Sequence, residues 1–145
     1  MLTREAVAAA LALAGIRTGA HVLDLTPDAG LTKAARAMAG STGRVDARPA
    51  APGEPAPTPE VRYAYALGIW SDRAPGAAVD GATSALGSLA PYARVTVGSA
   101  GSLSSLVDVL RSGGWTVLHA TTVPDADPAL GRPSELALAV ARRTD

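Results

Sequence analysis

The hydrophobic pattern of this chain changes repeatedly between the period of a helix and the period of a strand. The clearest helical period covers residues 103–110, where apolar side chains recur at i, i+3, i+4 and i+7 between a serine and two glycines. Capping residues and a following glycine predict helices at residues 4–14 and 28–39, and a further helix is predicted at residues 77–90. Apolar runs and strict alternation predict strands at residues 21–25, 43–47, 62–70, 93–97, 115–123 and 135–142.

The order of these elements predicts the fold class. Helices and strands alternate through most of the chain, and two strands follow one another at its end. Such alternation is typical of an α/β domain in which helices cover a mostly parallel sheet, and a final strand reached by a short connection is antiparallel. We therefore expect about six strands, and 145 residues are a natural length for a single domain, residues 1–145.

A proline-rich segment, residues 47–60, interrupts the alternation. It holds five of the eleven prolines of the chain. Proline has no amide hydrogen and a restricted φ, so neither a helix nor a central strand is expected here. We predict a semi-rigid strap within the single domain.

Composition excludes several classes of function. The 13 basic residues balance 13 acidic ones, and no basic cluster predicts nucleic-acid binding. There is no cysteine, and neither His21 nor His119 lies in a metal-ligand spacing, so no metal site is predicted. We expect His119 to be a partly buried structural residue and His21 to be exposed. The apolar stretch 6–14 is too short to span a bilayer, and we expect a cytoplasmic protein with no membrane partner.

Several stretches resemble the class I S-adenosylmethionine-dependent methyltransferases. Val-Leu-Asp-Leu at 22–25, with Gly30, resembles their motif I. Leu-Ala-Pro-Tyr-Ala-Arg-Val at 89–95 resembles their L-x-P-G-G-x-V motif, and residues 114–117 and 136–142 resemble their closing antiparallel hairpin. The resemblance covers nearly the whole chain and implies a three-layer Rossmann-like fold with strand order 2-1-4-5-7-6 in the family's numbering. It also implies that a bound cofactor would be contacted by Asp24, Thr26, Asp28, Gly30 and Asp46.

The cofactor loop departs from the family pattern. The glycines of G-x-G-x-G fall on Thr26, Asp28 and Gly30, so only the last is kept. Glycines let the backbone approach the cofactor and leave amides that face its carboxylate, whereas Pro27 has no amide. Asp28 suits a helix N-cap, which places a fixed anion where a ligand carboxylate would lie. We therefore expect ordinary cofactor binding to be lost.

The third-strand region of the family is missing, and the strap takes its place. One wall of the adenine pocket is then absent, and the strand at 43–47 becomes a sheet edge. Asp46 follows Asp24 by 22 residues, a spacing close to that of a ribose-binding acid, but it is interpreted chiefly as a solvent-facing edge charge. Asp24 is interpreted chiefly as a partner of the adjoining loop amides. Asp72 and Trp70, after the next strand, are the candidates for a general base and a pocket wall, or simply for a polar turn.

These features predict a degenerate methyltransferase-like protein of bacterial origin, a pseudoenzyme that does not methylate and holds no cofactor. It would serve as a partner or scaffold subunit, or as a repurposed small-molecule protein, in bacterial secondary metabolism. The alternative is an active minimal methyltransferase that uses S-adenosylmethionine on a small molecule, with Asp46 on the ribose and Asp72 or Trp70 at the methyl site. A protein partner or a homo-oligomer would bind through the exposed sheet edge or the Ala-rich face of residues 6–14.

Overall fold

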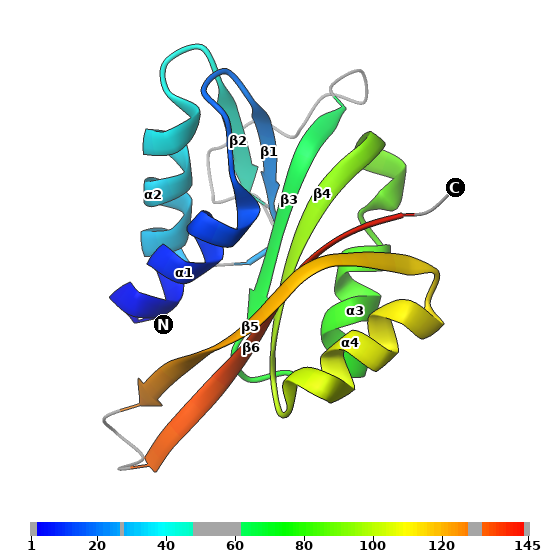
Figure 1. Ribbon diagram of the computed structural model, residues 1–145. Helices are drawn as coiled ribbons and strands as arrows, with labels where there is room; N and C mark the ends of the chain where they lie inside the picture. The colour runs from blue at the N-terminus through cyan, green and yellow to red at the C-terminus, as the bar shows by residue number, and fades with distance from the viewer. Residues whose placement is uncertain (1–2, 27, 48–61, 128–131, 144–145) are drawn as a thin grey trace.

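The computed structural model describes residues 3–26, 28–47, 62–127 and 132–143. The predicted strap lies almost wholly outside the described residues; only Ala47, the last residue of a strand, belongs to them. The described elements, shown in Figure 1, are α1 (Arg4–Ala14), β1 (His21–Asp24), α2 (Ala29–Ala39), β2 (Arg44–Ala47), β3 (Tyr63–Trp70), α3 (Pro75–Thr83), the short 3₁₀ turn η1 (Leu86–Ser88), β4 (Leu89–Ala100), α4 (Leu103–Ser112), β5 (Trp115–Asp127) and β6 (Arg132–Arg143).

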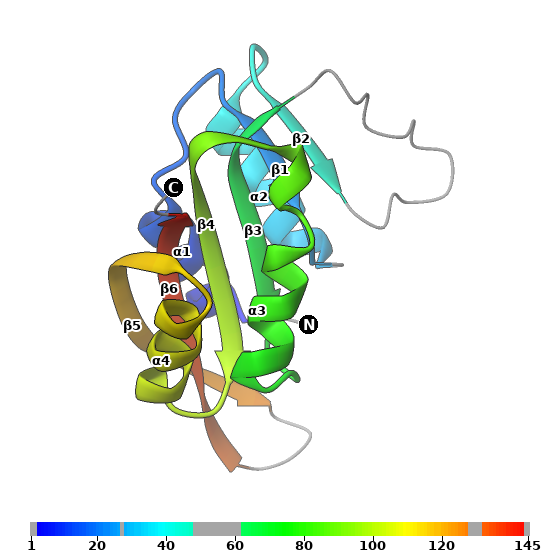
Figure 2. The ribbon, with the colours of Figure 1, turned by 90° about the vertical axis from the view of Figure 1, so that its right-hand side faces the viewer.

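The strands form one sheet in the order β2-β1-β3-β4-β6-β5. The strands β1 to β4 pair in parallel, whereas β6 is antiparallel to both β4 and β5. Helices α1 and α2 cover one face of the sheet, and α3 and α4 cover the other (Figures 1 and 2). Both the predicted fold class and the predicted strand order are confirmed.

Helix boundaries follow the predicted capping residues. The Thr3 hydroxyl accepts a hydrogen bond from the Ala6 amide at 3.1 Å, and α1 ends at Gly15 in a left-handed conformation, φ 63°. The Ser102 hydroxyl caps α4 in the same way, accepting from the Ser105 amide at 3.2 Å. These bonds join groups three residues apart, so the chain encodes them locally.

The predicted helix at 77–90 is wrong in its second half. Helix α3 ends at Thr83, and after η1 the chain is already extended at Leu89. Ser84, Gly87 and Ser88 lie in this stretch, and serine and glycine favour turns over helix. Pro91, expected to stop a helix, instead lies inside β4, where the register against β3 shifts and a ladder amide is not needed.

The C-terminal hairpin is longer than predicted. Strand β5 continues to Asp127 and β6 starts at Arg132, so the hairpin extends beyond the rest of the sheet (Figure 1). Pro124 lies in β5, which is an edge strand and therefore tolerates a residue without an amide hydrogen. Among the described residues, no helix combines the length and apolarity needed to span a membrane.

One residue has an unfavourable backbone conformation. Tyr92 has a φ of 63°, and it is the only described residue other than glycine with a positive φ. It occupies the first glycine position of the L-x-P-G-G-x-V motif. A left-handed conformation costs a residue with a side chain about 1–2 kcal/mol, and this side chain is 79% exposed. Packing in the core therefore does not offset the strain.

Candidate functional site

The loop after β1 is organised around the carboxylate of Asp24. Asp24 is fully buried. One of its oxygens accepts hydrogen bonds from the Thr26 amide at 2.9 Å and the Thr26 hydroxyl at 2.8 Å, and the other contacts the Thr32 hydroxyl. The side chain therefore bonds its own loop, as the structural interpretation of Asp24 expects. Pro27 lies outside the described residues.

Burial raises the pKa of Asp24, and the hydrogen bonds from Thr32 and Thr26 oppose this only in part. The contacts of Thr32 also favour the protonated form of Asp24. Its hydroxyl lies against Asp24 and also 3.0 Å from the Asp28 carbonyl oxygen, yet it has a single proton. A proton on Asp24 satisfies both contacts, because Asp24 then donates to Thr32 and Thr32 donates to the carbonyl.

The raised pKa predicts how stability varies with pH. The folded state binds the Asp24 proton more tightly than the unfolded state, so this residue contributes most below its ordinary pKa of 3.8, and the contribution is lost as pH rises through the folded value. In urea titrations from pH 3.5 to 7, we expect the stability difference between wild type and Asp24→Asn to shrink as pH rises. A difference that grew with pH would show a carboxylate stabilised in its charged form.

A second carboxylate, that of Asp28, caps the N-terminus of α2. Asp28 precedes the helix in an extended conformation and accepts a hydrogen bond from the Leu31 amide at 2.9 Å. The predicted N-cap is confirmed. Gly30 lies in the first turn, where an added Cβ would be 3.3 Å from the Asp28 carboxylate. The anion at this helix N-terminus thus comes from the chain itself.

Asp46 is also engaged within the chain. Its carboxylate accepts a hydrogen bond from the Tyr63 hydroxyl and forms an ion pair with Arg44 Nε at 2.7 Å. The hydrogen bond to Asp46 raises the pKa of Arg44. Tyr63 lies in β3, two strands away across β1, so Asp46 is more than a solvent-facing edge charge.

Trp70 packs between β3 and α3. Its side chain is 7% exposed, and a Cβ on Gly68 or Gly81 would lie 2.6 or 2.7 Å from its ring. The guanidinium of Arg73 lies 5.1 Å from the ring centroid. Asp72, in the turn after β3, is exposed. The structure thus places Trp70 in the core, between β3 and α3.

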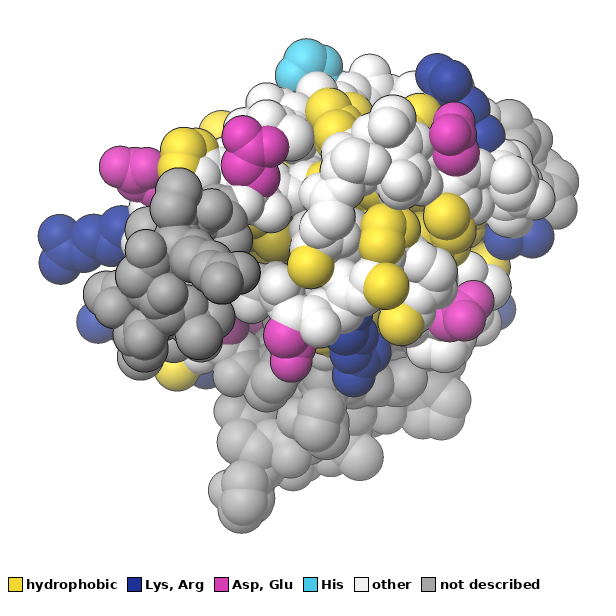
Figure 3. Space-filling model, turned by 90° about the horizontal axis from the view of Figure 1, so that it is seen from below, with side chains coloured by type: hydrophobic (Ala, Val, Ile, Leu, Met, Phe, Trp, Pro, Cys, Tyr) yellow, Lys and Arg dark blue, Asp and Glu magenta, His cyan; other side chains and the backbone are white. Residues whose placement is uncertain are grey.

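The strands β1, β2 and β3 end on one edge of the sheet, which Figure 3 shows from below. Over the part of this face that is visible, acidic and basic side chains are both present and neither kind gathers into a patch. Hydrophobic side chains lie between them. In the described part of the chain, no three histidine, aspartate or glutamate residues are placed to hold a metal ion.

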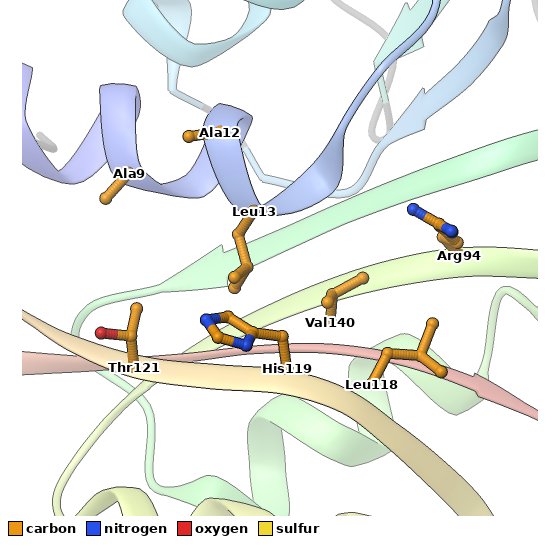
Figure 4. Close-up of a pocket in the computed structure, with 8 residues that line it drawn as sticks. All are labelled: Ala9, Ala12, Leu13, Arg94, Leu118, His119, Thr121 and Val140. Carbon is orange, nitrogen blue, oxygen red and sulfur yellow. The ribbon is translucent and has the colours of Figure 1, made fainter.

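A hollow of about 670 Å³ lies elsewhere, between α1 and the outer strands (Figure 4). We call it the α1–β5 hollow. Its lining residues are Ala9, Ala12, Leu13, Arg94, Leu118, His119, Thr121 and Val140. It exists because α1 presents alanines toward β5. Figure 4 shows Arg94 at one end and Thr121 at the other, with His119 between them.

The prediction for His119 is wrong, because this side chain is exposed. The register of β5 against β6 shifts between Val117 and His119, and this irregularity leaves both Leu118 and His119 on the surface. A strand bulge is not visible in the hydrophobic alternation, so periodicity alone could not find it. The prediction that His21 is exposed is confirmed.

No protein-family model matches the sequence, and no curated protein matches it either. Solved structures do match. The precorrin-6y C5,15-methyltransferase of Geobacter metallireducens is 10% identical, with a TM-score of 0.63 over 99% of this chain and 90% of that one. The Streptococcus pneumoniae protein Sp1610, solved in complex with S-adenosyl-L-methionine, is 15% identical, with a TM-score of 0.62 over 99% and 73% of the two chains. The [4+2]-cyclase SpnF is 12% identical, with a TM-score of 0.56 over 94% and 80%.

The chain has the class I methyltransferase fold. At these identities the likeness shows the fold alone. Within that fold, the loop after β1 is where the family's G-x-G-x-G pattern would contact the cofactor. In this chain the corresponding loop carries Thr26 and Asp28, and both make internal bonds: Thr26 bonds Asp24, and Asp28 bonds the Leu31 amide.

The structure brings only some of the predicted site residues together. Asp24, Thr26 and Asp28 form one hydrogen-bonded loop that leads into α2, and Thr32, which sequence reasoning missed, links Asp24 to the Asp28 carbonyl. Asp46 belongs to a separate cluster. Thr32 lies in the first turn of α2, after the capping Asp28. This position alone is a weak signal of a site residue, and only the fold shows that its hydroxyl contacts Asp24.

The Ala-rich face predicted for oligomer contacts is largely internal. Ala6, Ala10 and Ala14 are buried within the chain, whereas Ala8 and Ala12 are exposed. Alanine at these positions lets α1 approach the sheet closely.

Proposed function

We propose that this protein is a non-methylating member of the methyltransferase fold, and that it does not bind S-adenosylmethionine in the ordinary way. The observation that carries the proposal is the Asp28 carboxylate, which accepts the Leu31 amide at 2.9 Å at the start of α2. This is the position at which the family's loop offers amides to the carboxylate of the cofactor. An internal anion already occupies it.

The size of the expected effect follows from electrostatics. Two like charges about 4 Å apart repel by roughly 1 kcal/mol in water and roughly 4 kcal/mol near a protein surface. Every 1.4 kcal/mol is about a factor of ten in affinity. A cofactor carboxylate beside Asp28 would thus lose about one to three orders of magnitude in affinity, before any steric conflict with Thr26.

We propose that the protein acts instead as a repurposed small-molecule protein in bacterial secondary metabolism, or as the non-methylating partner subunit of another protein. The α1–β5 hollow supports the first role, because its volume lies within the range of small-molecule sites and it is mostly apolar with a few polar groups. The likeness to a [4+2]-cyclase is consistent with it, since that neighbour is named for a reaction other than methyl transfer.

Calorimetric titration with S-adenosylmethionine and S-adenosylhomocysteine tests the proposal. We expect no binding at micromolar concentrations. Asp28→Asn is the matched variant, because asparagine caps a helix as well as aspartate does but has no charge. It should fold normally, and it should bind more tightly than wild type if the charge is what excludes the cofactor.

Micromolar binding by wild type would overturn the proposal in favour of a minimal methyltransferase. That alternative also predicts that Asp46→Ala abolishes binding, because Asp46 would hold the ribose. The non-methylating role predicts no cofactor affinity for Asp46→Ala to remove.

A further inference from the structure

A second hollow is lined by residues from the segments that lead into β3 and β4, from the first residues of β4, from the start of β5 and from the end of β6. We call it the amino-edge hollow. Its volume is about 600 Å³. Its lining includes Arg62, Leu86, Leu89, Tyr92, Trp115 and Arg143. None of the residues predicted as a functional site lies here.

Tyr92 is the first reason to assign a function to this hollow. The chain has two tryptophans, three tyrosines and no phenylalanine. Tyr92 is the exposed one of these five, and it occupies a motif position that glycine normally fills, with the φ of 63° that glycine tolerates. Its ring adds little to core packing. A strained position that holds an exposed ring indicates a contact outside the folded chain.

Charge is the second reason. Arg62 is exposed at the rim, and Arg143 places its guanidinium 5.8 Å from the centroid of the Trp115 ring. Among the described residues that line this hollow, none is acidic. The chain as a whole is neutral, and the exposed guanidinium of Arg62 gives this hollow a positive group that favours an anion. Guanidinium groups pair with carboxylates in a planar, directional way.

The remaining lining is apolar and suits a flat ligand. Leu86, Leu89 and Pro91, which shortly precede Tyr92 in the sequence, also line the hollow. The buried Trp115 contributes to the same lining. Aromatic rings and arginine side chains both stack on planar groups. The site thus combines cations, an exposed ring and an apolar lining.

We propose that the amino-edge hollow binds a small aromatic carboxylate, with the carboxylate on Arg62 and the ring on Tyr92. The site lies at the edge opposite the cofactor loop. The inference therefore stands apart from the proposed function, and its test does not depend on whether S-adenosylmethionine binds.

Titration with 2-naphthoate tests the site in the full-length protein. Two further probes separate its parts: acetate has the carboxylate alone, and 2-naphthalenemethanol has the ring alone. The indole N–H signals of Trp115 and Trp70 in ¹H–¹⁵N spectra give the readout, assigned with Trp70→Phe. We expect 2-naphthoate to shift the Trp115 signal saturably and to leave Trp70 unchanged, with acetate and the alcohol at least tenfold weaker.

Variants of Tyr92 separate binding from folding. Tyr92→Gly removes the ring and relieves the backbone strain, so it should raise the thermal midpoint while weakening 2-naphthoate at least fivefold. Tyr92→Ala removes the ring and keeps the strain, so it should weaken binding without raising the midpoint. A lower midpoint for Tyr92→Gly would assign the ring a structural role and overturn the inference.

Arginine variants supply the matched control. Arg62→Gln should weaken 2-naphthoate at least fivefold, whereas Arg142→Gln, an exposed neighbour that does not line the hollow, should leave the affinity unchanged. An equal loss in both variants would indicate a general charge effect rather than a site. Absence of saturable binding by wild type would also overturn the proposal.

Discussion

Replacing Trp70 by alanine is expected to lower the free energy of unfolding by about 3–5 kcal/mol. The ring fills the space between β3 and α3, where Gly68 and Gly81 have no side chain. Removing the ring leaves a cavity that these two glycines cannot fill. The backbone of Gly68 is held by the hydrogen bonds of the sheet, and that of Gly81 by those of α3. Urea denaturation followed by circular dichroism measures the change.

The matched control is Asp72→Ala, two residues away. Asp72 is exposed in the turn, and we expect its replacement to change stability by less than about 0.5 kcal/mol. If Trp70→Ala had an equally small effect, the ring would not be a core residue, and its earlier interpretation as the wall of a methyl-transfer pocket would gain support.

Tyr63→Phe is expected to lower the free energy of unfolding by about 1.5–3 kcal/mol, the range for a hydrogen bond to a charged group. The Tyr63 side chain is almost fully buried and its hydroxyl donates to the Asp46 carboxylate. Phenylalanine fills the same space, so the loss reports the hydrogen bond rather than packing. Equilibrium denaturation at pH 7 measures it.

Tyr65→Phe provides the comparison, because Tyr65 lies two residues along the same strand and is only partly buried. Its replacement should change stability by less than about 0.5 kcal/mol. Equal effects of the two variants would mean that the contact between Tyr63 and Asp46 adds no stability. Asp46 would then be more available to an external ligand than its contacts indicate.

The predicted elements were correct wherever the signal was local. Thr3, Asp28 and Ser102 each bond an amide three residues ahead, and such a bond needs no information from the rest of the chain. Prediction failed where a residue's role depended on its sheet neighbours. Pro91 was expected to end a helix, but it lies in a strand whose register shifts there.

The contacts of the candidate site also divide into those that local sequence predicts and those that depend on tertiary packing. That Asp28 caps α2 follows from residue type and position. That Asp24 reaches Thr32, eight residues away, depends on how α2 packs against β1. Asp46 was recognised by its spacing from Asp24. Its partner Tyr63 lies 17 residues further on and two strands across the sheet, so hydrophobic periodicity could not predict their contact.

The sequence by itself predicted most of the helices and strands, because hydrophobic period and capping act over a few residues. The resemblance to the methyltransferase family implied the order of the strands in the sheet. It also predicted, from the family resemblance, that the loop after β1 departs from the G-x-G-x-G pattern at Thr26 and Asp28. Only the tertiary structure decided that Trp70 is in the core, that His119 is exposed, and that Tyr92, with its positive φ, lines the same hollow as two arginines. Each of these depends on distances between segments far apart in the chain, which are set when the sheet assembles and its helices pack.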